Sequence, residues 1–497
     1  METLLGSALL RHMSWFGRLR YLLLDRHFGR TLYVGMVGLC LLGTLVSAFL
    51  LREIWGPSDI IKGFLPAVAV VGLGIVVFAY TRMSWMPVIL ILVSTLVADG
   101  VGTGTGTKLT FTFLMLNLWL VVWLFKMLVV ERKLNIIPSI ANWPILAFCV
   151  VVVLSTIWSS IYVDPNVRYF FSDKLFPRLM TALVLIISPL TVLMLGNSIR
   201  NEHTLRTIVW WFIAVGFVFG VMRIGLGGVI NPLNDRGQFA TWVVMFAAGQ
   251  FFFNRRLSLM LRILLLVTIA MWIYVVLGLG FSWLSGWLPT FIGLVLISLI
   301  YSRKMLIPLG LAVLIYVIAN FGVLEENFGT ESEGSGVTRS NAWTEAFDVT
   351  SDHLLLGTGP AGYEFYFLVR GVYSGGIGTG QLAHNNYVDI VAQLGLAGIL
   401  AWLTIWGTLG VISVRTYRSV PADESGFISG LKATLLAAWP VTILTMMLGD
   451  WITPFTYTQG LAGIDYTIWH WVMPGMSLAL YAISQTKLAQ RQPSPST

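Results

Sequence analysis

Charged residues are too scarce in this sequence to cover a surface that faces water. Asp, Glu, Lys and Arg make up 11% of the 497 residues, whereas hydrophobic residues make up 57%. Soluble domains carry roughly 25% charged residues. Lipid must therefore be the main solvent, and the composition predicts one integral membrane domain rather than several soluble ones.

Apolar runs that approach the roughly 20 residues needed to cross a bilayer recur along most of the chain. We expect an all-α polytopic membrane protein with about 14 (12–14) transmembrane helices and one large, partly helical periplasmic loop. The expected spans lie near residues 31–51, 63–80, 85–99, 109–130, 142–163, 179–199, 207–228, 239–254, 259–280, 284–301, 305–321, 385–414, 431–449 and 467–485.

The two ends of the chain are polar and are expected to be cytoplasmic. Residues 1–30 carry five arginines before the first long apolar run, which predicts a basic amphipathic segment on the membrane face. The spanning domain covers residues 31–485, and residues 486–497 predict a disordered tail. With this orientation 21 of the 31 Lys and Arg residues lie at the cytoplasmic face, as the positive-inside rule requires. The net charge of +8 therefore reflects helix ends, and we expect no nucleic-acid partner.

One outer connection is unlike the others, because residues 322–384 form a long, polar, glycine-rich stretch. It contains GTESEGSGVTRSNAWTEAFDV, DHLLLGTGPAGYEF and GGIGTGQLAHNNY. A loop of this length in a compact protein is usually functional or disordered. Its aromatic residues argue against disorder, so we expect the chemistry of the protein to lie in this loop.

The polar residues of this loop and its surroundings are the candidates for chemistry. His384 stands where the chain re-enters the membrane, and a histidine there can act as a general base. Arg339, in the same loop, presents a planar fork of donors suited to phosphate oxygens. Arg236 lies in another outer connection, and Arg223 lies one to two turns from the outer end of its span. Each residue also has a non-functional interpretation, which stays open. His384 could simply cap a helix, the loop arginines could be solvated, and Arg223 could extend its side chain to the membrane interface.

Taken together, the loop motifs resemble the O-antigen ligase / O-antigen polymerase superfamily of bacterial envelope glycosyltransferases. Arg339 matches the loop arginine of that family, and residues 353–359 (HLLLGTG) match its H/P-L-x-G-x-G stretch. His384-Asn385 with Gly395 and Gly398 match its H-N…G-x-x-G helix start. Arg236, beside the NPLN of residues 231–234, loosely matches an upstream outer arginine. The strong match runs from Arg339 to about Trp402. The Ser-Arg-Gly-like signature of the family is missing from residues 281–287, and fourteen spans exceed the roughly twelve of the ligases.

The resemblance implies an enzyme that transfers or polymerises glycan from an undecaprenyl-diphosphate carrier onto an acceptor hydroxyl at the periplasmic face of the bacterial inner membrane. It implies an inverting, metal-independent reaction without a cofactor. The implied catalytic residues are His384, Arg339 and Arg236. The residues expected to bind substrate are Arg223, Asn385, Asp389, Gly357, Gly359 and Trp343.

The acceptor and the class of activity stay open at this point. A polysaccharide polymerase is favoured, and a ligase that transfers glycan to lipid A core is the alternative. The expected partners are the lipid-linked donor, a glycan or lipid A core acceptor, the bilayer, and chain-length or export proteins. A transporter or flippase of lipid-linked sugars is the competing class, although transporters usually show internal repeats and polar residues near the midplane.

Overall fold

The structure is a computed structural model, and it describes residues 74–97, 100–102, 108–165, 167, 175–225, 238–279, 284–322, 325, 337–369, 383–454 and 460–491. The chain divides into two compact units, residues 1–86 with 117–136, and residues 87–116 with 137–497. The expected N-terminal segment, Arg236 and residues 492–497 lie outside the described part.

Almost all of the described secondary structure is helical, as the composition predicts. The helices are α5 (Met86–Leu96), α6 (Phe111–Phe125), α7 (Asn142–Ile161), α9 (Leu175–Ser198), α10 (Glu202–Gly225), α11 (Phe239–Phe253), α12 (Leu259–Ile273), α13 (Leu284–Tyr301), α14 (Leu306–Ala319), α16 (Val337–Asp352), α17 (Tyr363–Val369), α18 (Asn386–Ser419), α19 (Phe427–Leu448) and α20 (Ile464–Arg491). Short 3-10 or π-helical turns are η1 (Met83–Trp85), η2 (Lys126–Glu131), η4 (Tyr274–Leu279), η5 (Arg303–Met305) and η7 (Leu461–Gly463).

Eight helices in the described part are long and apolar enough to cross a membrane, or up to nine if a bent pair is one span. This supports an all-α polytopic membrane protein, while the count of about 14 is not confirmed. Two expected spans within the described part illustrate the agreement in position: α11 (Phe239–Phe253) lies in the expected span 239–254, and α12 with η4 (Leu259–Leu279) lies in the expected span 259–280. Helix α11 is apolar but has 15 residues, fewer than the roughly 20 that a helix needs to cross a bilayer.

Two local features differ from the sequence expectation. The sequence predicts no strand, but β1 (Gly100–Gly102) and β2 (Lys108–Thr110) pair as two antiparallel strands. Helix α20 continues to Arg491, so residues 486–491 of the expected tail are helical. Both strands are short, and the all-α class holds.

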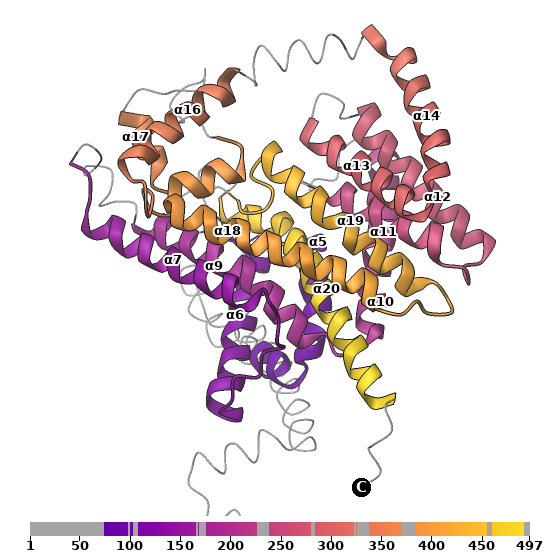
Figure 1. Ribbon diagram of the computed structural model, residues 1–497, viewed down its shortest axis with the longest axis horizontal. Helices are drawn as coiled ribbons and strands as arrows, with labels where there is room; N and C mark the ends of the chain where they lie inside the picture. Colours follow the sequence, from indigo (N-terminus) through magenta and orange to yellow (C-terminus); the bar gives the residue numbers. More distant parts are fainter. Residues whose placement is uncertain are drawn as a thin grey trace, which may run out of the picture. The chain divides into compact units, whose positions relative to one another are not determined.

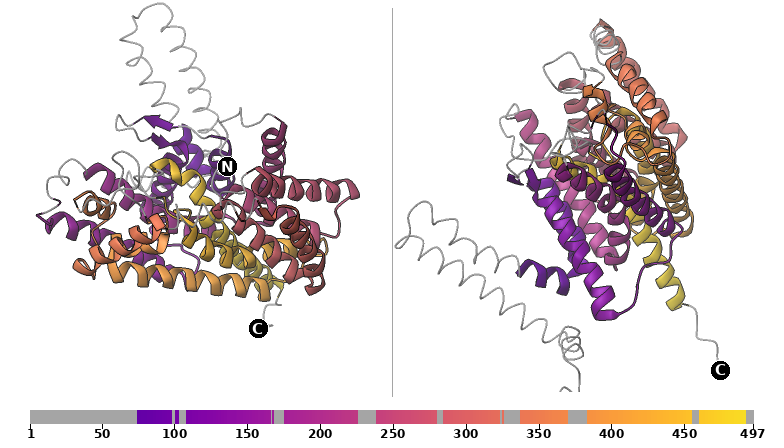
Figure 2. Two further views of the ribbon diagram at one scale, coloured as in Figure 1. Left: turned by 90° about the horizontal axis from the view of Figure 1, so that it is seen from above. Right: turned by 90° about the vertical axis from the view of Figure 1, so that its left-hand side faces the viewer.

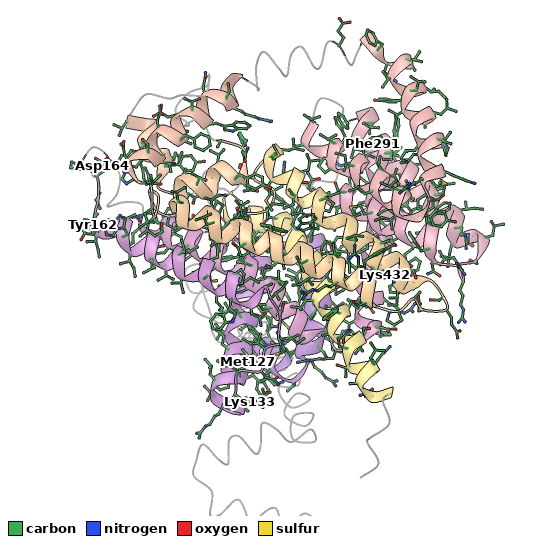
Figure 3. The ribbon with its side chains drawn as sticks, in the orientation of Figure 1. Met127, Lys133, Tyr162, Asp164, Phe291 and Lys432 are labelled. Carbon is green, nitrogen blue, oxygen red and sulfur yellow. The ribbon has the colours of Figure 1, made fainter. Side chains whose placement is uncertain are left out.

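The smaller unit includes η1, η2 and the second half of α6. Arg132 ends η2 in the left-handed region, with φ of 50°, and its N–H donates to the carbonyl of Met127. Figure 3 shows Met127 and Lys133 together at this end of the helix.

The core of the larger unit forms around α18 and α20. Helix α18 packs against α7, α19, α20 and α16, and Figure 1 shows it lying beside α7 and α19. Helix α20 packs against α9, and α11 packs between α12, α13 and α19. The interior is rich in aromatic residues: Trp402, Trp406 and Trp471 form a contiguous group with ring centroids 5.0–5.9 Å apart. The elements can be followed by colour in Figure 2, and its right-hand view shows α14 at the upper edge of the larger unit.

Helix direction gives the larger unit two ends with different chemistry. Ion pairs Arg206–Asp423, Arg256–Glu424 and Lys487–Glu202, at 3.2, 2.7 and 2.5 Å, gather at one end. The N-termini of α18 and α20 and the C-terminus of α19 lie at the opposite end. We call this the histidine end, because His384 immediately precedes α18.

Candidate functional site

His384 is held in a defined position just before α18. Asn385 is the N-cap of that helix, and its side-chain oxygen accepts hydrogen bonds from the N–H groups of Tyr387 (2.9 Å) and Val388 (3.4 Å). This is the usual role of an N-cap asparagine. His384 has φ of 43°, which turns the chain sharply into the helix. The side chain of His384 is 44% exposed, and its Nδ1 lies 3.3 Å from Oδ2 of Asp450, whose side chain is 1% exposed.

Asp450 follows α19, and a polar clamp fixes the segment that carries it. Asn386, at the first position of α18, donates from Nδ2 to the carbonyl of Thr453 at 2.9 Å. Its Oδ1 accepts from the N–H of Ile452, also at 2.9 Å. The indole of Trp471 donates to the carbonyl of Ile452 at 2.8 Å. The His384–Asp450 contact therefore joins two segments whose backbones are already tied together.

A second buried carboxyl lies behind Asp450. Asp389, in the first turn of α18, is 2% exposed and lies within hydrogen-bonding reach of Asp450. The hydroxyl of Tyr363 donates to Oδ1 of Asp389 at 2.5 Å. Burial, followed by the neighbouring charges of Asp389 and Asp450, raises the pKa of Tyr363 well above its usual 10.0. The tyrosine therefore remains a hydrogen-bond donor at any physiological pH.

Helices α16 and α17 pack over this histidine end through a compact apolar cluster. Its members are Val167, Ala342, Ala346, Val349, Tyr363, Phe365, Tyr366, Phe367, Ala383, Val388 and Ala392, with Trp343 packed against them. The indole of Trp343 donates to the carbonyl of Ala383 at 2.6 Å, next to His384. The hydroxyl of Tyr366 lies 2.7 Å from Nε2 of His353. The described part of the loop is therefore folded onto α18, as its aromatic residues predict.

Arg339 lies on α16 one helical turn before Trp343. Residues four apart lie on the same helix face, and Trp343 is bonded to the residue that precedes His384. Arg339 is half-buried. The fold thus places the face of α16 that carries this arginine toward the His384 segment.

The LLLGTG stretch binds the backbone of α18 where that helix is broken. Gly395 interrupts α18 with φ of 64° and ψ of −160°. The N–H groups of Thr358 and Gly359 donate to the carbonyls of Ala392 and Gln393 at 3.0 and 2.9 Å. In return, the N–H groups of residues 396 and 397 donate to the carbonyls of residues 354 and 355. A helix break leaves such groups without partners, and the loop supplies them.

Gly357 and Gly359, which the resemblance implies bind substrate, lie in close contact with other parts of the protein in this structure. A Cβ on Gly357 would lie 2.4 Å from the carbonyl carbon of Gln393. A Cβ on Gly359 would lie 2.5 Å from Nη2 of Arg178. Both glycines also have positive φ. Their close approach to α18 and to Arg178 explains why glycine stands here.

Sequence reasoning missed several residues of this region, foremost Asp450. Arg178, at the start of α9, is 1% exposed and donates to the hydroxyl of Ser159 on α7. Ser155, one turn earlier, donates to the carbonyls of Leu356 (2.7 Å) and Gln393 (3.1 Å). A signal for Asp450 exists in the sequence: it is one of two acidic residues, with Asp465, in the connection between the expected spans 431–449 and 467–485.

The remaining predicted residue in the described part is Arg223. It is exposed in the last turn of α10. Since α10 begins at the end that carries Glu202 and Lys487, its last turn points to the histidine end. The structure therefore brings together His384, Asn385, Asp389 and Trp343, places Arg339 on the neighbouring helix face, and leaves Arg223 at the same end of the unit.

The described residues include no group of three or more His, Cys, Asp or Glu side chains arranged to hold a metal ion. The chain matches no model of a known protein family, and no curated protein is a significant match to it.

Proposed function

We propose that this protein is a membrane glycosyltransferase that moves or polymerises glycan from an undecaprenyl-diphosphate carrier onto an acceptor hydroxyl. The observation that carries the proposal is the pair of His384 and Asp450. An imidazole whose Nδ1 is held by a buried carboxylate presents Nε2 as a base of fixed orientation. The half-exposed ring of His384 leaves that second nitrogen for a substrate hydroxyl.

The proposed step is a single displacement at the anomeric carbon of the donor. His384 Nε2 takes the proton of the acceptor hydroxyl while the oxygen of that hydroxyl forms the new bond to the anomeric carbon. The bond from the carbon to the diphosphate oxygen breaks, and undecaprenyl diphosphate leaves with the electron pair. Attack opposite to the leaving group inverts the configuration. Asp450 stabilises the imidazolium that forms at His384.

Negative charge grows on the diphosphate as the bond breaks, and cations placed there beforehand lower the barrier. Arg339, on the α16 face next to the His384 segment, is the proposed partner of the diphosphate. Arg236 is proposed for the same role from the sequence motif, and Arg223 for the lipid-side phosphate. A lipid-borne donor fits a site at the ends of apolar helices, because its tail stays in the bilayer.

Polymerase remains the favoured form of the proposal, and transfer of glycan to lipid A core is the alternative.

The competing transporter hypothesis has one observation in its favour. His470 is fully buried within α20, in the expected span 467–485, with Nδ1 3.2 Å from the hydroxyl of Thr442. An ionisable residue inside a membrane span is by default a candidate for function.

One experiment separates these classes. Purified protein is incubated with an undecaprenyl-diphosphate oligosaccharide, alone or with lipid A core, and products are followed by mass spectrometry. A transferase makes a longer lipid-linked glycan or glycosylated core, and it does so in EDTA. Movement of the lipid across vesicles without a new glycosidic bond would instead identify a flippase.

A further inference from the structure

The hydrogen bonds around the buried carboxyl groups of Asp389 and Asp450 leave open whether one of the two carries a proton. Asp389 Oδ1 accepts from Tyr363, and Asp450 lies against His384 Nδ1. Oδ2 of Asp389 is buried and makes no hydrogen bond with the described residues. The neighbour of Asp389 is the Asp450 carboxyl, which is itself 1% exposed.

An ionised carboxylate can only accept hydrogen bonds, whereas a protonated one also donates. Two ionised carboxylates in contact inside a protein repel each other strongly, so such pairs share one proton. A single proton on Asp389 would remove the repulsion between the pair. It would also turn the unsatisfied Oδ2 of Asp389 into a donor toward Asp450.

We propose that Asp389 is a neutral carboxylic acid that donates its proton to Asp450, and that Tyr363 holds its other oxygen in place. The inference rests on the proposed function in one respect, namely that Asp450 orients a catalytic base. The pair then carries one negative charge, and this charge lies on Asp450, in contact with His384. Asp389 and Tyr363 are positioning residues, because they act on His384 only through Asp450.

The arrangement explains why Asp450 is held by more than its histidine. With only His384 as partner, the Asp450 carboxyl could rotate about its χ2 torsion. A second hydrogen bond, from Asp389, fixes that torsion and aims Oδ2 at Nδ1. The donor is itself rigid, since Tyr363 is fully buried and Asp389 stands in the first turn of α18, next to the Asn386 clamp.

Infrared spectroscopy of the full-length protein tests the proton directly and does not depend on activity. The protein is labelled with ¹³C-carboxyl aspartate and purified in a maltoside detergent, which has no ester carbonyl. Wild-type protein minus Asp389→Asn is expected to show the C=O band of a protonated carboxyl, with a shift in D₂O. Asp465→Asn, which removes another buried aspartate, should retain that band. A difference spectrum with carboxylate bands alone would overturn the proposal.

Variants then decide which carboxyl carries the proton. Asparagine imitates a neutral carboxylic acid, so Asp389→Asn should recover most of the transfer activity that Asp389→Ala loses, whereas Asp450→Asn should lose about 100-fold. The reverse order of the two asparagine variants would place the proton on Asp450 and contradict the assignment. If wild-type protein shows no transfer at all, the proposed function fails, and the infrared result still decides whether the carboxyl pair holds a proton.

Discussion

At the scale of single residues, strain and burial gather around His384. Three non-glycine residues in the described part have positive φ, and two of them, Ala361 and His384, lie in this region. Such conformations cost about 1–3 kcal/mol each and persist only where the surroundings enforce them. At His384 the Asn385 cap and the Trp343 bond to Ala383 enforce the turn. Strain maintained at a half-exposed histidine on a buried carboxylate is what a functional role would require.

Arg339 carries the second residue-scale prediction. Arg339→Ala should lower glycan transfer by about 100-fold or more, because a preorganised charge near the leaving group is lost. Arg339→Lys should recover only part of the activity, since lysine lacks the planar fork. The measurement is the initial rate with purified protein. Thr344→Ala, on an exposed position of the same helix, is the control, and equal rates for the Arg339 and Thr344 variants would remove Arg339 from the mechanism.

Sequence alone could find some of these residues and not others. His384 stands at the border between a polar loop and an apolar run, and the sequence alone shows this border. Asp450 lies far along the chain, and only the antiparallel course of α18 and α19 brings it to the histidine. The same holds for Tyr363 and Asp389, which come from different helices. Gly357 and Gly359 were expected to bind substrate, whereas their contacts with α18 depend on a helix break that no periodicity reveals.

At the scale of elements, the break in α18 is the feature that joins the loop to the membrane helices. The loop and the helix exchange backbone hydrogen bonds on both sides of Gly395. The sequence predicts one span near 385–414, and the helix runs from Asn386 to Ser419. Long apolar runs fix where helices lie to within a few residues. A break at one glycine inside such a run is invisible, because glycine is also common in unbroken membrane helices.

Two glycines of α18 give a matched test of the break. Gly395→Ala should lower thermal stability, since the Cβ would lie 2.5 Å from the carbonyl carbon of Leu355 and φ is 64°. The strain is worth about 1–3 kcal/mol or more. Gly407→Ala meets nothing within 4 Å and should leave stability equal or higher. Thermal unfolding in detergent is the measurement, and similar losses in both variants would contradict a helix broken at Gly395.

At the scale of the whole molecule, charge and the candidate site fall at opposite ends of the larger unit. Arg206, Arg256 and Lys487 pair with acids at one end, and His384 lies at the other. On the basis of the positive-inside rule we propose that the first end is cytoplasmic. The site would then face the periplasm, the side on which the proposed lipid-linked donor would be exposed.

Cysteine labelling tests this orientation. In a chain without Cys40 and Cys149, Ser351→Cys on α16 and Glu424→Cys between α18 and α19 are both exposed. An impermeant maleimide should label position 351 in intact spheroplasts and position 424 only after the membrane is opened. Glu424→Cys labelled from outside, with Ser351→Cys protected, would invert the topology and remove access to a periplasmic donor.

The central claim is that His384 transfers a proton during glycan transfer, and one measurement tests it most directly. Purified wild-type, His384→Ala and His203→Ala proteins are compared for transfer from an undecaprenyl-diphosphate oligosaccharide. His203 is an exposed histidine at the far end of α10. We predict that wild-type and His203→Ala proteins form product at similar rates and that His384→Ala protein forms none above background. Product formed by His384→Ala at the wild-type rate would contradict the account.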